Sequence, residues 1–173
     1  MIETYNTILQ EGQDEIVEKK SRFIGYAVPV SSEEEAYAFV EKIRKQHYDA
    51  RHNCYAFAIG SENTLLRFSD DGEPQGTAGV PILDVLRKRQ LTDLCVVVTR
   101  YFGGVLLGTG GLVHAYTTAA CQAIENGGIA IYALFQTFYI QCSYSDYQKI
   151  LHENQRFSVR VEQADFSQHV ALH

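Results

Sequence analysis

The chain has 173 residues, of which 46% are hydrophobic and 21% are charged, and these values are typical of a folded globular protein. Its formal net charge of −6 argues against a nucleic-acid binder that relies on general positive charge, so a polyanion could be bound only at a local basic site. No window has the roughly 20 consecutive apolar residues that a membrane-spanning helix needs, and we expect no membrane partner.

The cysteines and the N-terminus indicate a reducing compartment. The four cysteines lie far apart, and none of their spacings matches a zinc knuckle. Each lies in an apolar run, where a free thiol behaves as a small hydrophobic side chain. The N-terminus lacks the basic and apolar regions of a secretory signal peptide. We therefore expect a cytoplasmic protein without a cofactor.

The first part of the chain predicts two strands and a helix. Two runs of β-forming residues within residues 13–30 are interrupted at Lys19-Lys20-Ser21. Residues 31–47 then predict a helix, because Ser31 or Ser32 can form a capping box with the acid three residues later. Apolar residues recur at helical spacing behind this cap, which gives the helix one buried face.

The middle of the chain predicts a hairpin, a helix and a central strand. Residues 53–68 contain two β-forming runs around a turn at Gly60–Asn63. Pro81 suits the start of a helix that ends near the basic residues 87–89, where cations complement the helix dipole. Residues 94–99 are continuously apolar, which is typical of a strand that is buried on both faces.

A core helix is expected from about Leu112 to Asn126, followed by a domain boundary. The predicted domains are residues 1–132 and 133–173. The second domain reads as strand, helix, strand, strand, which is two-thirds of a ferredoxin-like unit. These elements are expected at residues 137–144, 146–154, 157–163 and 169–172.

Four segments carry long and unusual motifs, and together they resemble the IMPACT (YigZ-like) family. The motifs are KKSRFIG at residues 19–25, RHNCYAF at 51–57, SDDGEPQGTAG at 69–79 and VVVTRYFGGVLLG at 96–108. The resemblance covers about residues 15–130, and the motifs occur in the family order. With its second domain, the chain resembles the bacterial type.

The resemblance implies an α+β fold with two domains. The first would be similar to the second domain of ribosomal protein S-five, with a mixed four-stranded sheet and two helices on one face. The second would be ferredoxin-like and similar to the C-terminal domain of elongation factor G. The sequence departs from the family here, because it ends before the last helix and strand of that unit, so we expect a partial β-α-β-β domain.

The resemblance also implies a role in translation. In eukaryotic relatives, the family is implicated in restraining the kinase that senses amino-acid starvation, by competing for a ribosome-associated activator. Bacterial-type members are suspected of contacting RNA or the translation machinery. The implied function is regulatory binding to RNA, the ribosome or a translation-associated protein.

Three acids, Asp70, Asp71 and Glu73, lie within one turn-forming loop. They are weak candidates for a divalent cation site, because hard cations prefer carboxylate oxygens but need about six oxygen ligands. The alternative is an exposed acidic turn, or acids paired with Arg51 or Arg100.

Arg100 directly follows the buried strand and precedes Tyr101 and two glycines. In a cleft, its guanidinium could grip a carboxylate or phosphate bidentately. It could equally form an internal ion pair with one of the acids at 70–73. The sequence leaves both interpretations open, and Tyr101 is included in the expected binding site.

Glycines follow Arg100 and precede the core helix, where free N–H groups attract anions. They permit positive φ and close backbone approach, and tight packing is the alternative role. His114 could donate to the same anion or be a structural histidine. The glycines of the expected binding site are Gly103, Gly104, Gly108, Gly110 and Gly111.

The remaining positive charge comes from Lys19, Arg22, Arg51 and His52, which could form a local basic edge near the sheet. Ordinary solvated surface is the alternative. Together with Arg100, this edge is the expected contact with RNA or a protein partner.

A phosphate- or nucleotide-binding enzyme is the competing function. It would use the Gly-rich segment at 108–111 and the acids at 70–73, but the sequence lacks the P-loop pattern GxxxxGK[ST] with its lysine. Since no convincing pair of nucleophile and base is present, the sequence favours a binding protein over an enzyme.

Overall fold

The computed structural model describes residues 4–60, 64–133, 136–157 and 161–172. The chain divides into two compact units, Met1–Ala133 and Leu134–His173. In the described residues, the first unit has two sheets and three helices, and the second has one sheet and one helix. Within the described ranges, no helix combines the length and the apolar character needed to cross a membrane.

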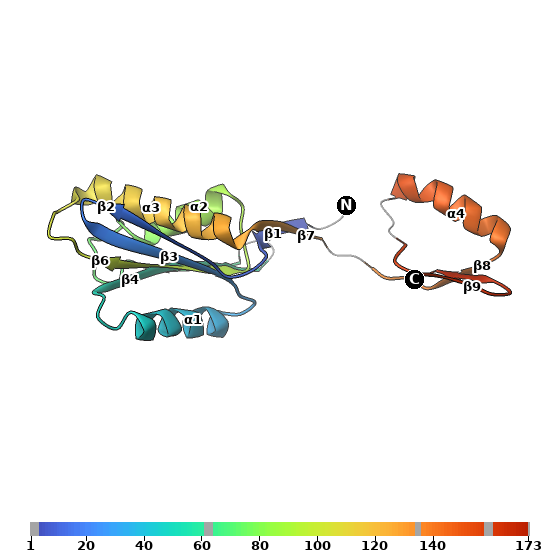
Figure 1. The fold of residues 1–173 in the computed structure, drawn as a ribbon, viewed down its shortest axis with the longest axis horizontal. Coiled ribbons are helices and arrows are strands. Elements are labelled where there is room, and N and C mark those ends of the chain that lie inside the picture. Colours follow the sequence, from blue (N-terminus) through green and yellow to red (C-terminus); the bar gives the residue numbers. More distant parts are fainter. Residues whose placement is uncertain (1–3, 61–63, 134–135, 158–160, 173) are drawn as a thin grey trace. The chain divides into compact units, whose positions relative to one another are not determined.

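The first unit is built around a five-stranded sheet with the order β2-β3-β6-β4-β5 (Figure 1). All neighbouring pairs are antiparallel. The α+β class is confirmed, but the sheet has one strand more than the resemblance implied and is not mixed. The strands are β2 (Gly12–Glu18), β3 (Ser21–Pro29), β4 (His52–Ile59), β5 (Leu65–Ser69) and β6 (Leu94–Tyr101).

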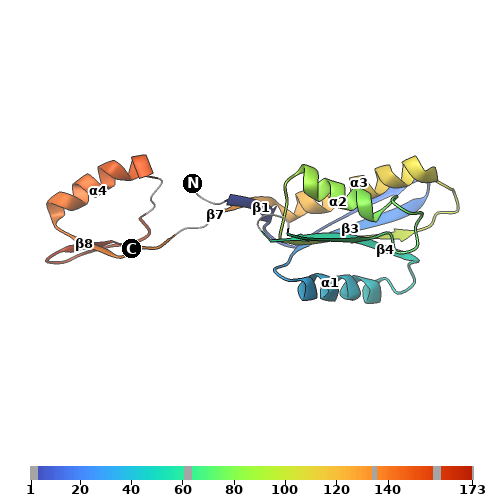
Figure 2. The same cartoon turned by 180° about the vertical axis from the view of Figure 1, so that it is seen from behind.

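Helices cover both faces of this sheet (Figures 1 and 2). Helices α2 (Gly79–Lys88) and α3 (Gly108–Gly127) lie on one face, as the resemblance implied, and α1 (Glu33–Gln46) lies on the other. Because side chains alternate across a strand, β6 supplies apolar residues to a hydrophobic cluster on each face. This explains the uninterrupted apolar run of its sequence.

The starts of two helices can be compared with the starts predicted from the sequence. The capping box at the start of α1 forms with Ser32, whose hydroxyl accepts the N–H of Glu35 at 3.2 Å, while the Glu35 carboxylate accepts the N–H of Ser31 at 2.7 Å. Helix α3 begins at Gly108, four residues before the predicted start at Leu112. The glycine cluster is therefore the first turn of the helix and not a loop that precedes it.

A two-stranded antiparallel sheet that was not predicted joins the beginning and end of the first unit. It pairs β1 (Thr4–Ile8) with β7 (Ile129–Ala133). The N–H of Leu9 donates to the carbonyl of Gly128 at 2.8 Å, and Ile8 is fully buried. The residues before β2 are thus held at the C-terminal end of α3.

The second unit contains β8 (Ile140–Cys142), α4 (Tyr144–Phe157), β9 (Ala164–Phe166) and β10 (Val170–Leu172). Its antiparallel sheet has the order β8-β10-β9, as in the first three strands of a ferredoxin-like unit. The predicted β-α-β-β unit is therefore confirmed.

One predicted strand of the second unit, at residues 157–163, is wrong. Helix α4 extends to Phe157, residues 158–160 lie outside the described part of the chain, and residues 161–163 form no strand. The hairpin turn decides the position of the true strand, because Ser167 N–H donates to His169 carbonyl and Val170 pairs with Phe166. In the first unit, residues 61–63 of the predicted hairpin turn also lie outside the described residues.

Candidate functional site

The motif-bearing segments meet at one end of the central sheet. Arg22 on β3 lies opposite Tyr101 on β6, and Arg100 on β6 lies opposite His52 on β4. The turn before β3, the loop after β6 and the acidic loop after β5 all reach this end. The first turns of α3 also approach it, because Tyr116 of α3 packs edge-to-face on Phe23 near the start of β3.

Asp70 organises the acidic loop through the backbone. One carboxylate oxygen accepts the N–H groups of Ala78 at 3.0 Å and Gly79 at 2.8 Å, and the other accepts the N–H of Gly76 at 2.8 Å. Ala78 is the N-cap residue of α2 and has no side chain that could cap the helix. Asp70 therefore supplies the cap from a position eight residues upstream.

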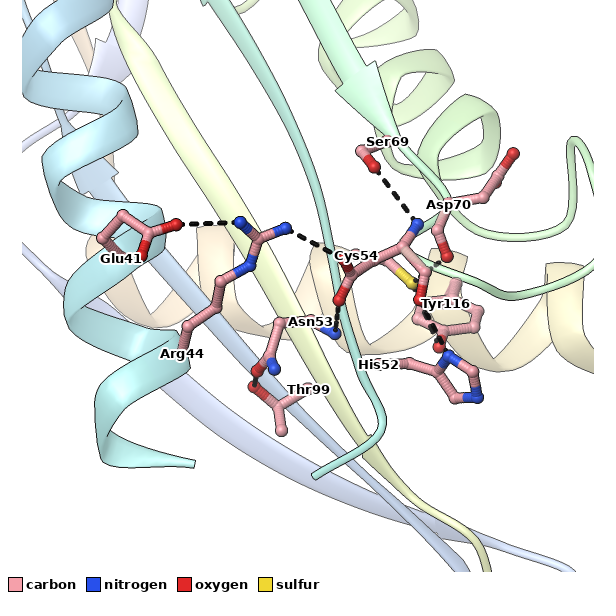
Figure 3. A network of polar contacts seen from close by, with 10 residues as sticks. Glu41, Arg44, His52, Asn53, Cys54, Ser69, Asp70, Thr99 and Tyr116 are labelled. Carbon is pink, nitrogen blue, oxygen red and sulfur yellow. Dashed lines mark hydrogen bonds and ion pairs between the residues drawn. The ribbon is translucent and has the colours of Figure 1, made fainter. Parts of the chain in front are cut away.

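Asp71 ties the same loop to β4 and α1. Its carboxylate accepts the N–H of Asn53 at 2.7 Å and forms an ion pair with Arg44 at 2.9 Å. Figure 3 shows part of this polar network, including the hydrogen bond that the Thr99 hydroxyl donates to the Asn53 side chain at 2.7 Å. His52 Nδ1 lies 2.9 Å from the carbonyl oxygen of Asp71, so this nitrogen carries the proton and donates.

Glu73 and Arg100 form a buried ion pair with an N–O distance of 2.6 Å, and their side chains are only 3% and 7% exposed. The Tyr116 hydroxyl donates to the same Glu73 oxygen at 2.8 Å. The Arg100 guanidinium lies 5.4 Å and 5.6 Å from the ring centres of Phe23 and Phe102. Of the two interpretations that the sequence left open, the structure has the internal ion pair, so Arg100 does not act as an exposed cation.

The three acids do not converge on a cation. Each carboxylate already accepts hydrogen bonds from its own protein donors, and these donors would have to be given up before a metal could bind. Within the described ranges, no group of three or more histidine, cysteine or acidic side chains could hold a metal ion. Asp70, Asp71 and Glu73 serve instead as a helix cap, a loop anchor and one half of a buried ion pair.

Two further groups in this network are held in their neutral forms. Burial raises the pKa of the Cys54 thiol, which donates to the carbonyl of Asp70 at 2.9 Å, and it raises the pKa of the Tyr116 phenol. Since the thiolate is the reactive form of cysteine, a buried Cys54 with a raised pKa is not an activated nucleophile.

Tyr101 is engaged in a hydrogen-bonded chain on the α1 face. Its hydroxyl donates to Asp49 at 2.8 Å and lies 2.9 Å from His47 Nδ1, while His47 Nε2 lies 2.6 Å from the hydroxyl of Tyr26. Burial raises the pKa of Tyr101 to about 12 and lowers the pKa of His47. A neutral His47 with its proton on Nδ1 satisfies every group in this chain.

The basic side chains at this end of the sheet differ in whether they are already paired within the protein or exposed for binding. Arg22 pairs with Glu15 at 2.8 Å, and His52 is bound to Asp71. Lys19, Lys20 and Arg51 are exposed, and none of them has an ion-pair partner among the described residues. The sequence had not singled out Lys20.

The glycines of the site have different roles. Gly103 packs against the turn before β3, because a Cβ there would overlap the Lys20 carbonyl group, and its N–H donates to the Ser21 hydroxyl at 3.1 Å. Gly104 has a φ of 85° in open space. Gly108, Gly110 and Gly111 lie in the first turn of α3, which has no side-chain cap and no acid, and His114 is exposed one turn later.

The loop between β6 and α3 also exposes apolar side chains that the motifs did not reveal as a surface. Phe102, Val105 and Leu106 are 53%, 41% and 82% exposed. Because an apolar pattern alone does not show which side of a loop faces solvent, only their exposure in the fold could identify them.

Known proteins share both the sequence and the fold. Residues 19–124 match the Impact N-terminal domain. The chain is 42% identical to the IMPACT family member YvyE of Bacillus subtilis, over 98% of this chain and 78% of that protein. It is 44% identical to the IMPACT family member YigZ of Escherichia coli, over 73% of this chain and 63% of that protein.

A crystal structure of a hypothetical protein superimposes with a TM-score of 0.73 and 36% identity, over 99% of this chain and 84% of that one. A family match over more than half of the chain, together with these identities, establishes the relationship. The chain belongs to the IMPACT family.

Proposed function

We propose that this chain is a translation-linked regulatory protein that binds RNA, the ribosome or a translation-associated protein at the motif-bearing end of its central sheet. Family membership supports the link to translation, which is the role that the resemblance implies. The observation that carries the proposal is the convergence of four motifs, distant in sequence, on one end of one sheet.

The site has two layers that suit a binding protein. The inner layer is the network of Asp70, Asp71, Glu73 and Arg100, in which nearly every charge has a partner and the loop is held in one conformation. The outer layer carries Lys19, Lys20 and Arg51, which are exposed and form no ion pair within the described part of the chain. A rigid base lowers the entropic cost of binding, because little has to be ordered when the partner arrives.

The contact is expected to run through Lys19 and Arg51, with Arg22 and His52 beside them. Arg100 lies beneath this surface, where it forms an ion pair with Glu73 and packs its guanidinium against the ring of Phe102. The competing function of a magnesium-dependent nucleotide-binding enzyme has no comparable support, because the acids that would hold the cation already accept protein hydrogen bonds.

Co-sedimentation with purified ribosomes across a salt series tests the proposal. We expect binding of the unmodified chain to weaken steeply with salt, as for contacts to phosphates or to carboxylates. Lys19→Glu/Arg51→Glu should reduce binding by roughly tenfold or more, since each change reverses one contact charge.

The matched control is Arg87→Glu/Lys88→Glu, which makes the same change of net charge at the C-terminal end of α2, where both side chains are exposed. This control should bind like the unmodified chain. Absence of sedimentation at low salt would exclude the ribosome and its RNA as the partner. Equal losses in both double variants would refute a contact at this end of the sheet.

A further inference from the structure

We propose that the Lys19–Lys20 turn and the loop of residues 102–107 form one docking surface for an acidic protein segment with at least one large apolar side chain. The inference builds on the proposed function and names the class of partner, which is a protein and not RNA.

The turn keeps its two lysines in an unfavourable backbone conformation. Glu18 pairs with Ser21, so Lys19 and Lys20 form the two-residue loop of the β2–β3 hairpin. Their φ angles are 45° and 67°, which is the type I′ geometry that strongly favours Asn-Gly. Residues held in the left-handed region cluster at functional sites. Here the strained pair presents two exposed ammonium groups that have no ion-pair partner among the described residues.

The turn and the loop after β6 are held together as one surface. Gly103 lies so close to the turn that no side chain would fit between its backbone and the Lys20 carbonyl group. Its N–H donates to the hydroxyl of Ser21, which is fully buried. Because these contacts join the two segments, the cations of the turn lie next to the apolar loop.

The loop contributes an apolar area beside these cations. Phe102 is half exposed and has the buried Arg100 guanidinium against its ring. Val105 is 41% exposed and Leu106 is 82% exposed, although solvent exposure of a leucine side chain gains nothing for folding. An apolar surface beside exposed cations is complementary to a segment in which carboxylates flank a leucine or an aromatic residue.

The same features argue against RNA as the occupant. Proteins that bind single strands stack bases on several aromatic rings along a positively charged groove. This surface has one aromatic residue, Phe102, with aliphatic Val105 and Leu106 beside it. Its two lysines have no ion-pair partner among the residues that the structure describes, and the chain has a net charge of −6. Such a composition suits a short acidic and apolar peptide better than a polyphosphate.

Selection of phage-displayed random peptides on the intact chain tests the proposal. We expect enriched peptides to combine Asp or Glu with Leu, Ile or Phe. The affinity of a selected synthetic peptide, measured by fluorescence anisotropy, should fall roughly tenfold in Lys19→Gln/Lys20→Gln and in Leu106→Ser. The Arg87→Gln/Lys88→Gln variant removes the same charge from α2 and should bind normally.

The proposal is overturned if enriched peptides lack acids, if the two site variants bind them as the unmodified chain does, or if nothing is enriched. It is also overturned if fluorescein-labelled oligouridylate binds and its affinity falls in the same two variants, because RNA would then be the occupant. Failure here is distinguishable from failure of the proposed function. If ribosome binding is lost in Lys19→Glu/Arg51→Glu but no acidic peptide is selected, the proposed function stands and the acidic protein segment is excluded as the partner.

Discussion

The acidic loop at Asp70–Glu73 and the basic turn at Lys19–Lys20 both lie at one end of the central sheet and both concentrate like charge in a few residues. Their surroundings differ completely. Every acid of the loop accepts hydrogen bonds from protein donors, whereas the two lysines have no ion-pair partner within the described part of the chain. A charged motif therefore indicates a binding site only if its charges lack partners within the protein.

The difference has a physical basis. A carboxylate is short and accepts hydrogen bonds, so the free N–H groups at the start of α2 and β4 can satisfy Asp70 and Asp71. The Lys19 and Lys20 side chains, at the tip of the β2–β3 hairpin, are exposed and form no ion pair among the described residues.

The strongest test of the comparison is Arg100→Leu, which leaves Glu73 buried without its cation. We expect a loss of about 3–5 kcal/mol in the free energy of unfolding, measured by urea denaturation with circular dichroism. The double variant Arg100→Leu/Glu73→Leu should recover part of this loss, because no buried charge remains. A single variant as stable as the unmodified chain would mean that the pair is not buried in solution.

A smaller loss is expected for Asp70→Ala, which removes the acceptor of three backbone N–H groups. The expected decrease in the free energy of unfolding is about 2 kcal/mol, in the range of a lost helix cap with partly buried donors. Asp70→Asn is the matched control: its amide oxygen can still accept the N–H groups of Ala78 and Gly79, but its NH2 group cannot accept the N–H of Gly76, so a smaller loss is expected. If both variants were equally destabilised, the carboxylate charge or its bond to Gly76, and not the cap of α2, would be the important feature.

The smallest expected effect is an increase, and not a loss, in the free energy of unfolding. Lys19→Asn/Lys20→Gly places the residues that type I′ turns favour at the two positive φ angles, and should raise the free energy of unfolding by about 1 kcal/mol. The same variant should bind ribosomes more weakly in the sedimentation assay. A more stable chain that binds less well would show that the lysines are retained for a partner, and an unchanged affinity would make the turn a structural feature only.

Much of the fold could be predicted because its signals are local. The capping box at Ser32 and Glu35 marked the start of α1, and the unbroken apolar run from Leu94 marked the central strand. The missed elements depend on distant partners. Strand β1 has no distinct pattern of its own and forms by pairing with β7, more than a hundred residues later. The strand predicted at 157–163 had suitable residues, but the turn at Ser167–His169 sets the register of the hairpin.

The family, the α+β class and the segments that carry the site could be predicted from the sequence, because motifs, periodicity and caps are properties of neighbouring residues. Which charges of the site are available for a partner depends on the tertiary structure. Arg100 meets Glu73 across 27 positions of the chain, and Asp71 meets Arg44 across the same separation. Whether a charge is paired inside or left outside depends on such long-range contacts and on burial, and both arise only when the strands of the sheet have come together.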